Sequence, residues 1–455
     1  MNAESIGAKA ELRRSFSLRV GAAGLGTIST FLLTVIVVRT LDARDTAAFF
    51  AILAALPIGS IVGRLGLGQN VVRLIPAEPT VAGRRIVAGT HLQATVLLTL
   101  PTAPLIAVCA TVGLIGHGDF LEALLLTTAM IMLEAVRTML SDIFAALGRV
   151  TAAVATMHYF RSAAVLPVVA IVAFGLDEPS MLNLLTAYTV VAAIQVVVSL
   201  GFAKSDITIR FSGVFSSLRR AIADGSRLFA FEVTAFLIIS GSIWLASATF
   251  PPVTAAHYSA AMTIATQVTL FEGLAAAAVM PPAARLWAAG RRREVVRLLS
   301  DLSTVNTVIT IAVVAVLAAF GATALEFAYG ASMRDAGVLL VILAAGGIPQ
   351  AALSVAASLL IISGEIDAVG RTSLLVLVAV VPSAIAAALL GGALTLSIVA
   401  GLGLAALYIS LWLTARRVLD DAPFPHWRVI RAARELISET VHRTEDETDS
   451  TPTAV

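Results

Sequence analysis

Apolar runs of about 20 residues, the length that a helix needs to cross a bilayer, recur along almost the whole chain. Hydrophobic residues make up 58% of the 455 residues and charged residues only 13%. Soluble domains carry about 25% charged residues. Lipid gives the backbone no hydrogen-bond partners, so only helices and closed barrels span it. The continuous runs lack the period-two alternation of barrel strands. We therefore predict an all-α polytopic membrane protein.

We predict about twelve transmembrane helices, joined by short polar connections that make successive helices antiparallel neighbours. The predicted spans are 18–38, 46–72, 88–115, 121–147, 151–175, 181–202, 226–249, 255–283, 297–320, 337–362, 368–390 and 394–415. The even-numbered connections are basic, with residues such as Arg84 and Arg149, whereas the odd-numbered ones collect Asp119 and Asp177. Because basic loops stay in the cytoplasm, we expect a multi-pass protein of the cytoplasmic membrane with both termini cytoplasmic.

The chain also repeats itself weakly. "AAFFAI" (47–52) resembles "AAHYSA" (255–260), and "RRIVAGTHLQATV" (84–96) aligns with "RREVVRLLSDLST" (292–304) at the same offset of 208 residues. Each copy has an even number of predicted spans, so the copies have parallel topology. We therefore predict two pseudo-symmetric six-helix bundles around a central cavity, a plan that transporters use.

This repeat divides the chain into four predicted parts. They are an amino-terminal bundle (1–203), a cytoplasmic interfacial linker (204–225), a carboxyl-terminal bundle (226–417) and a cytoplasmic tail (418–455). The linker and the start of the tail, "FPHWRVIRAARELI", are basic and amphipathic, which predicts helices lying on the membrane surface. Solvated surface helices are the alternative. The last 18 residues, "SETVHRTEDETDSTPTAV", are polar and charged, a composition typical of disorder.

A few ionisable residues fall inside the predicted spans, where each charge costs about 2.5–3.5 kcal/mol on insertion scales. Such residues should face a cavity or one another. Arg161 is the deepest arginine, and Arg137 lies three residues after Glu134, so that these two can pair on one helix face. Arg64 is near enough to a span end to reach the headgroups instead. The set is Arg64, Glu134, Arg137, Asp142, Arg161, Glu232 and Glu272.

These charges predict an anionic substrate rather than a catalytic reaction. Arginine stays charged and binds phosphate with a planar fork of donors, so a diphosphate suits the arginine cluster. Glu272, Glu232 and Glu134 are the candidates for ion coupling, with a purely structural role as the alternative. No metal-ligand spacing or catalytic dyad stands out, so we predict no enzyme activity, no cofactor and no nucleic-acid partner.

Two stretches carry a family resemblance. They are "VVRTLDARDTAAFFAILAAL" (37–56), followed by "GRLGLGQNVVRLIP" (63–76), and "ALGR" (146–149). The chain resembles the polysaccharide-flippase (O-antigen exporter) branch of the multidrug/oligosaccharidyl-lipid/polysaccharide exporter superfamily. It departs from that branch at Asp42, where glycine is usual, and at Ala47–Ala48, which replace a Tyr-Gly pair.

The resemblance implies a flippase that moves a polyprenyl-diphosphate-linked oligosaccharide to the outer leaflet for lipopolysaccharide or exopolysaccharide synthesis. It implies polysaccharide polymerase and assembly proteins as partners, and two bundles that rock around an arginine-lined cavity. Arg39, Arg64 and Arg73 match the family motif as substrate-binding residues. Arg137 and Arg161 do not match the motif. We predict them as substrate-binding residues only because charged side chains inside membrane spans should face a cavity or one another.

Three other classes remain open. A cation-coupled multidrug exporter of the same superfamily would need acidic residues to dominate the cavity, where the arginines at least match them. A membrane glycosyltransferase or polymer ligase usually carries a large outer loop, and the odd-numbered connections here are short. A non-transporting scaffold would have dispensable arginines.

Overall fold

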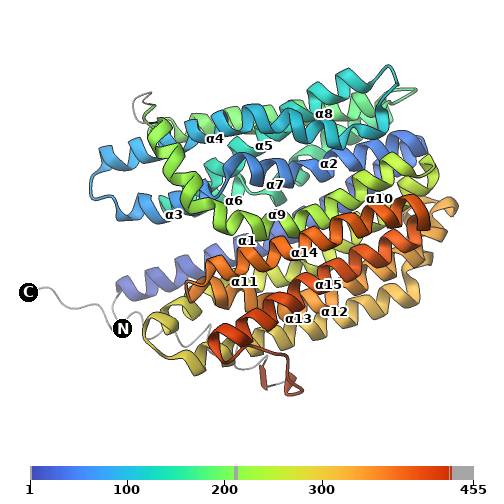
Figure 1. The fold of residues 1–455 in the computed structure, drawn as a ribbon. Helices are drawn as coiled ribbons and strands as arrows, with labels where there is room; N and C mark the ends of the chain where they lie inside the picture. The colour runs from blue at the N-terminus through green and yellow to red at the C-terminus, as the bar shows by residue number, and fades with distance from the viewer. Residues whose placement is uncertain (1–2, 210–213, 430, 433–455) are drawn as a thin grey trace, which may run out of the picture.

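The computed structural model describes residues 3–209, 214–429, 431 and 432, and helices form nearly all of this part of the chain. Two helical bundles lie side by side with their long axes roughly parallel (Figure 1). We call them the amino-terminal and carboxyl-terminal lobes. One end of the molecule carries the basic connections with Arg84, Arg149 and Arg291, and we call it the basic end. The other end carries Asp119 and Asp177, and we call it the opposite end.

The amino-terminal lobe contains the helices of the first predicted six spans. They are α1 (Ala3–Thr40), α2 (Ala43–Arg64), α3 (Leu67–Ala77), α4 (Val81–Ala110), the 3-10 turn η1 (Val112–Leu114), α5 (Phe120–Ala146), α6 (Val150–Ala155), α7 (His158–Gly175) and α8 (Met181–Ala203). Helix α2 is the most buried of the candidate spans in this lobe, because α4, α5 and the helices of the second lobe pack around it.

The carboxyl-terminal lobe repeats the same plan. Its elements are α9 (Val214–Thr249), α10 (Pro252–Ala265), η2 (Thr266–Thr269), α11 (Leu270–Ala288), α12 (Arg292–Tyr329), η3 (Ala331–Asp335), α13 (Ala336–Ile362), α14 (Ile366–Ala386), the π-turn η4 (Ala387–Gly391) and α15 (Gly392–Leu419). Helix α9 packs against α14 in its own lobe and against α2 and α4 in the other, and so lies between the lobes.

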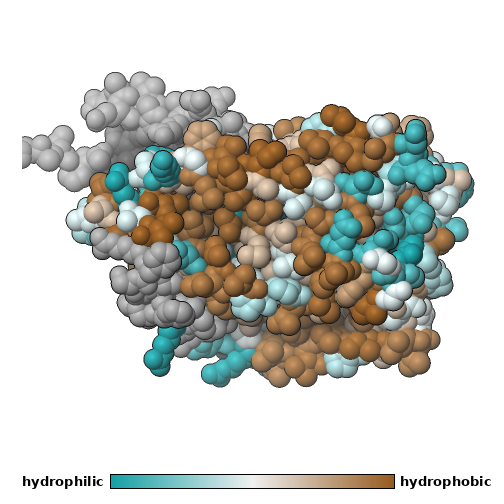
Figure 2. Space-filling view, turned by 90° about the horizontal axis from the view of Figure 1, so that it is seen from above, coloured by the Kyte–Doolittle hydropathy of each residue, from teal (hydrophilic) through white to brown (hydrophobic). Residues whose placement is uncertain are grey.

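The predicted fold class is confirmed. Eight segments of the described residues are long and apolar enough to span a membrane, and the longest, Ile366–Leu419, contains both α14 and α15. Gly24–Thr40 and Phe160–Gly175 are shorter apolar helices. Figure 2 shows a face of the molecule covered largely by apolar residues, with hydrophilic ones gathered toward one end. An apolar surface is what lipid requires, and the described helices expose large apolar side chains such as Leu100 on α4 and Val197 on α8.

Three predicted spans are interrupted rather than continuous. Span 46–72 breaks between α2 and α3, where Leu65 and Gly66 have φ angles of 40° and 79° in the left-handed region that ends helices. Span 151–175 breaks between α6 and α7, where Met157 is extended. Span 255–283 breaks at η2, a 3-10 turn that tightens the helix. Hydropathy does not report such breaks, because apolar residues surround them.

Helix α9 runs without a break from Val214 to Thr249, so residues 214–225 of the predicted linker are helical and continuous with the predicted seventh span. The part of α9 that is long and apolar enough to span a membrane is Phe229–Thr249, close to the predicted span 226–249. Residues 210–213 of the predicted linker, and residues 433–455 of the predicted disordered tail, lie outside the described residues.

Helices α13 and α15 approach each other closely at a pair of glycines. A Cβ atom at position 346 would lie 2.6 Å from the Cα atom of Gly401, which is backbone and cannot rotate away. Small residues commonly allow such approaches between membrane helices, where dispersion contacts drive association. The same atom at position 321 on α12 would meet only ordinary contacts, at 3.6 Å or more.

We expect Gly346→Ala to lower the thermal unfolding midpoint of the detergent-solubilised protein. Forcing the two helices apart should cost about 1–3 kcal/mol of the free energy of unfolding. The matched control, Gly321→Ala, should be neutral or stabilising by up to about 1 kcal/mol, because alanine is the better helix former. Equal effects of the two substitutions would contradict the close approach.

Candidate functional site

A buried ionic triad lies inside the amino-terminal lobe. The carboxylate of Glu134 on α5 accepts hydrogen bonds from Arg137, at 2.5 Å from Nη2 and 3.0 Å from Nε. Nη1 of Arg161, on α7, lies 2.6 Å from Oε2 of the same carboxylate. The three side chains are 3–13% exposed. Glu134 thus neutralises part of the charge of two arginines that would otherwise stand alone in an apolar interior.

The triad also holds the interrupted fifth span together. Nη1 of Arg137 donates a hydrogen bond to the carbonyl oxygen of Thr156, at the end of α6. A helix end leaves such carbonyls without partners, and an arginine side chain can satisfy them. The guanidinium of Arg161 lies 5.6 Å from the ring centroid of Tyr188 on α8. The triad therefore links α5, α6, α7 and α8 around the break.

Arg64 lies at the end of α2 and pairs with a different acid. Its Nη1 is 2.6 Å from Oδ2 of Asp142 on α5, and its Nε donates to the carbonyl of Ser60 at 3.2 Å. The side chains of Arg64 and Asp142 are 17% and 27% exposed, so this pair is more accessible than the triad. One helical turn away, Ser60 donates to Thr138 at 3.3 Å. Together these contacts form a short polar ladder between α2 and α5.

The glycines around Arg64 make this arrangement possible. A Cβ atom at Gly63 would collide with Oγ1 of Thr99, and one at Gly68 would collide with Oδ2 of Asp142. Gly66 has the positive φ at which α3 begins. Any side chain at position 68 would displace the carboxylate from Arg64. The glycines of this motif thus allow close packing of α2, α4 and α5 and make room for the ion pair.

Arg39 lies apart from these residues, at the opposite end. Its Nε and Nη2 donate to the carbonyls of Ala328 and Phe327, at 2.7 and 2.8 Å, and so cap the end of α12 in the other lobe. The hydroxyl groups of Thr34 and Tyr329 lie 2.7 Å apart beside it. Arg39 therefore links the two lobes and does not belong to the arginine cluster.

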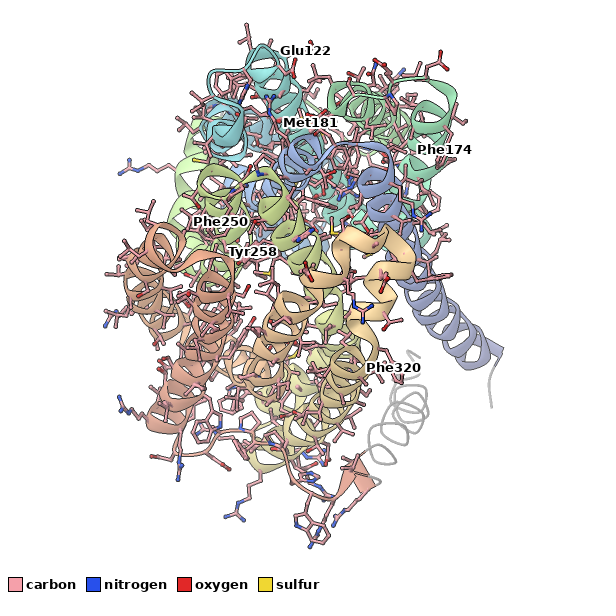
Figure 3. All side chains as sticks on the ribbon, turned by 90° about the vertical axis from the view of Figure 1, so that its right-hand side faces the viewer. Glu122, Phe174, Met181, Phe250, Tyr258 and Phe320 are labelled. Carbon is pink, nitrogen blue, oxygen red and sulfur yellow. The ribbon has the colours of Figure 1, made fainter. Side chains whose placement is uncertain are left out.

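Further contacts join the lobes toward the same end. The indole Nε1 of Trp244 on α9 donates to the carbonyl of Ala51 on α2 at 2.9 Å. A Cβ atom at Gly113 would lie 2.5 Å from Oγ of Ser247 on α9. Figure 3 views this end, where Phe250 and Tyr258 lie together in an edge-to-face contact of 6.4 Å. The two lobes are thus in contact at the opposite end.

The remaining predicted site residues are dispersed. Arg73 is on α3, but its side chain lies outside the described residues. Glu232 is half-buried on α9. Glu272 is in the first turn of α11, just after the η2 break, and its Oε2 atom is buried without a hydrogen-bond partner. Gln350 and Ser354 of α13 are its polar neighbours.

The internal repeat places Arg64 and Glu272 at equivalent positions, a relation that we did not predict from the sequence. The 208-residue offset that aligns Ala47 with Ala255 also carries Arg64 onto Glu272. Each residue lies beside the interruption of its span, in the second span of its lobe. Matching positions in the two lobes therefore carry a base and an acid. Among the described residues, no group of three His, Cys, Asp or Glu side chains has the geometry of a metal site.

No family model matches the sequence, and no curated protein does either. Solved structures match over most of the chain. The lipid II flippase MurJ, in an inward closed conformation, gives a TM-score of 0.66 at 14% identity, covering 97% of this chain and 93% of that one. The MATE multidrug transporter DinF-BH gives a TM-score of 0.64 at 17% identity, covering 89% of this chain and 95% of that one.

An inward-facing MATE family transporter of the MOP superfamily gives a TM-score of 0.61 at 14% identity, covering 89% of this chain and 98% of that one. At these identities the likeness shows the fold and nothing beyond it. The chain has the fold shared by the MATE transporters and MurJ.

The two ion pairs should differ in their contribution to stability. We expect Glu134→Gln to cost about 3–5 kcal/mol of the free energy of unfolding, because it leaves two buried arginines without a counter-charge. Asp142→Asn should cost about 1 kcal/mol or less, since its pair is partly exposed. Thermal unfolding and the yield of monodisperse protein measure both. Similar losses for the two variants would refute the distinction.

Proposed function

We propose that this chain is a flippase that moves a polyprenyl-diphosphate-linked oligosaccharide across the cytoplasmic membrane by alternating access, for cell-surface polysaccharide synthesis. The observation that carries the proposal is Arg64. It stands at the interruption of a membrane span, partly exposed, with Asp142 as its one side-chain ion partner in the described structure. MurJ, a lipid II flippase by its description, shares the fold over nearly the whole chain.

The charge balance of the amino-terminal lobe favours an anion. Three guanidiniums, those of Arg64, Arg137 and Arg161, face only two carboxylates, those of Glu134 and Asp142. One positive charge is therefore left over among these five groups. A diphosphate would meet that charge, and an arginine fork can bind two of its oxygens at once.

The arginines take different roles in this proposal. Arg64 contacts the diphosphate and exchanges Asp142 for it when substrate enters. Arg137 and Arg161, committed to Glu134, keep the α6–α7 break in shape and add long-range positive potential. Arg73 remains a substrate-binding residue by its motif position. Arg39 keeps the opposite end closed through its hydrogen bonds to the carbonyl oxygens at the end of α12. These hydrogen bonds break when that end opens.

The proposal places the basic end in the cytoplasm, with both termini on that side of the plasma membrane. Substrate then enters between the lobes from the basic end while the contacts of Arg39 and Trp244 keep the opposite end shut. Polysaccharide polymerase and assembly proteins are the expected partners after release.

Replacing Arg64 should abolish export without removing folded protein. In a strain that lacks the wild-type gene, we expect Arg64→Gln to restore less than a tenth of the surface polysaccharide, because one charged hydrogen-bonding group contributes about 1.5–3 kcal/mol. Membrane protein amount, measured by immunoblot, should stay near wild type. The matched control is Arg149→Gln, which removes an arginine paired with Asp206 at the basic end.

A double variant separates binding from structure. If Arg64 only neutralises Asp142, then Arg64→Gln combined with Asp142→Asn should restore export, because no unpaired carboxylate remains. If Arg64 binds substrate, the double variant should stay inactive while its thermal stability recovers. Restored export would remove Arg64 from the substrate site.

A cation-coupled multidrug exporter is the second candidate, and one observation favours it. Glu272 holds a buried carboxylate oxygen without a hydrogen-bond partner, beside a helix break, at the repeat position of Arg64. Such a group suits reversible binding of a proton or a cation. In either transporter, we propose Glu272 as the coupling residue, with Glu232 and Glu134 as the other acidic candidates.

Glu272→Gln should uncouple transport from the ion gradient, because the amide neither releases a proton nor carries a charge. We expect export by the wild type to respond to collapse of the proton or sodium gradient with ionophores. Export by the variant should be low and unresponsive. Glu294→Gln, which removes an exposed carboxylate paired with Arg291, is the control. A variant with normal, gradient-dependent export would exclude Glu272 from coupling.

A further inference from the structure

The segment 420–429 after the last helix folds back along the first turns of α12 (Figure 1). The amide nitrogens of Phe424 and His426 donate to the hydroxyl oxygens of Ser300 and Thr304, at 3.3 and 2.9 Å. The indole of Trp412 on α15 donates to the carbonyl of Pro423 at 3.1 Å. This segment, which we call the tail strap, is thus fixed to two helices of the carboxyl-terminal lobe.

A pocket of about 500 Å³ lies between the tail strap and α12. Its lining residues are Arg297, Asp301, His426, Trp427, Arg428 and Arg431. Three of the six are arginines: Arg297 is on α12, Arg428 is in the strap, and Arg431 lies just after the strap. The pocket is at the basic end, away from the triad and from Arg64, which belong to the other lobe.

The charge of this pocket is positive on balance. Asp301 is its one carboxylate, and Oδ1 of that carboxylate lies 2.8 Å from Nε2 of His426. Asp301 is 4% exposed, whereas the side chain of His426 is 33% exposed, so this contact is partly buried. The guanidinium of Arg428 lies 5.2 Å from the ring centroid of Trp427, whose side chain is 84% exposed. Guanidiniums of this kind bind phosphate through charge-assisted hydrogen bonds.

The same face of α12 leads from the pocket to a lipid-exposed surface. Arg297, Asp301 and Thr304 are spaced by three or four residues, and Val308 and Ile311 continue that spacing. Val308 and Ile311 are 41% and 48% exposed. The exposed apolar side chains of Val308 and Ile311 would therefore lie next to a phosphate bound in the pocket. A lipid needs this arrangement, because its acyl chain follows its headgroup. Trp427, which lines the pocket, is 84% exposed, and exposed tryptophans are typical of the membrane interface.

We propose that this pocket binds the phosphate of an anionic lipid headgroup, with the acyl chain lying along Val308 and Ile311. The site stands on its own geometry and does not depend on the transported substrate. Its ligand is a structural or regulatory lipid of the leaflet at the basic end, and it ties the tail strap to that leaflet.

Native mass spectrometry of the full-length protein in detergent, with equal amounts of dioleoyl phosphatidylglycerol and dioleoyl phosphatidylcholine, tests this site. We expect the wild type to retain phosphatidylglycerol about tenfold better, and the variant Arg297→Gln/Arg428→Gln to lose that preference, since a charged hydrogen bond accounts for about a factor of ten. Both arginines are exposed, so the variant should fold.

The matched control is Arg293→Gln/Arg417→Gln, which removes two exposed arginines near the same end that do not line the pocket. It should keep the preference for phosphatidylglycerol. Equal losses in the two double variants, or no preference in the wild type, would overturn the proposal. Displacement of the lipid by millimolar inorganic phosphate would also overturn it, because the site would then take a soluble phosphate compound.

Discussion

Two arginines remain charged in the interior of the amino-terminal lobe because one carboxylate, that of Glu134, contacts both of them. Removing Glu134 would leave two uncompensated positive charges in an apolar environment, which is far more costly than losing a surface ion pair. The same cluster satisfies the carbonyl of Thr156, which the break between α6 and α7 would otherwise leave without a partner. The ionic triad and the broken helix therefore depend on each other. Arg64 takes no part in that cluster and, among the acids of the described residues, pairs with Asp142 alone, which is why we propose it as the substrate-binding arginine.

The two lobes contain the same helical plan but different chemistry. At the repeat position where the first lobe has Arg64, the second has Glu272, and both lie next to an interrupted span. Interrupted spans are a common place for binding sites in transporters, because they expose backbone groups and polar side chains at depth. If the arginine binds the anionic substrate and the carboxylate couples transport to an ion gradient, then each lobe carries one of these two tasks. The hydrogen bonds of Arg39 and Trp244 join the lobes toward the opposite end, and α3 also packs against α9 in the basic half of the molecule.

The order and spacing of the helices could be predicted from hydropathy, because lipid admits only helices and closed barrels and the apolar runs lack the alternation of barrel strands. The pair of Glu134 and Arg137 also followed from their spacing on one helix face. The breaks at Leu65, Met157 and η2 could not be predicted, since they depend on local backbone angles and on partners from distant helices. The partners of Arg64 and Arg161 were missed for the same reason. A weak signal was available for one of them: Ser60 and Arg64 share the four-residue spacing of Thr138 and Asp142, as two polar pairs on facing spans.

The proposed function requires the transported molecule to be a lipid-linked oligosaccharide that carries a diphosphate. The most direct test is to delete the gene, extract the membrane lipids and quantify polyprenyl-diphosphate oligosaccharides by mass spectrometry, with surface polysaccharide measured in the same cells. If the chain is this flippase, lipid-linked repeat units should accumulate while surface polymer falls, and the mass of those units would identify the sugar. An unchanged lipid pool, with increased sensitivity to cationic drugs, would contradict the account and support the drug exporter.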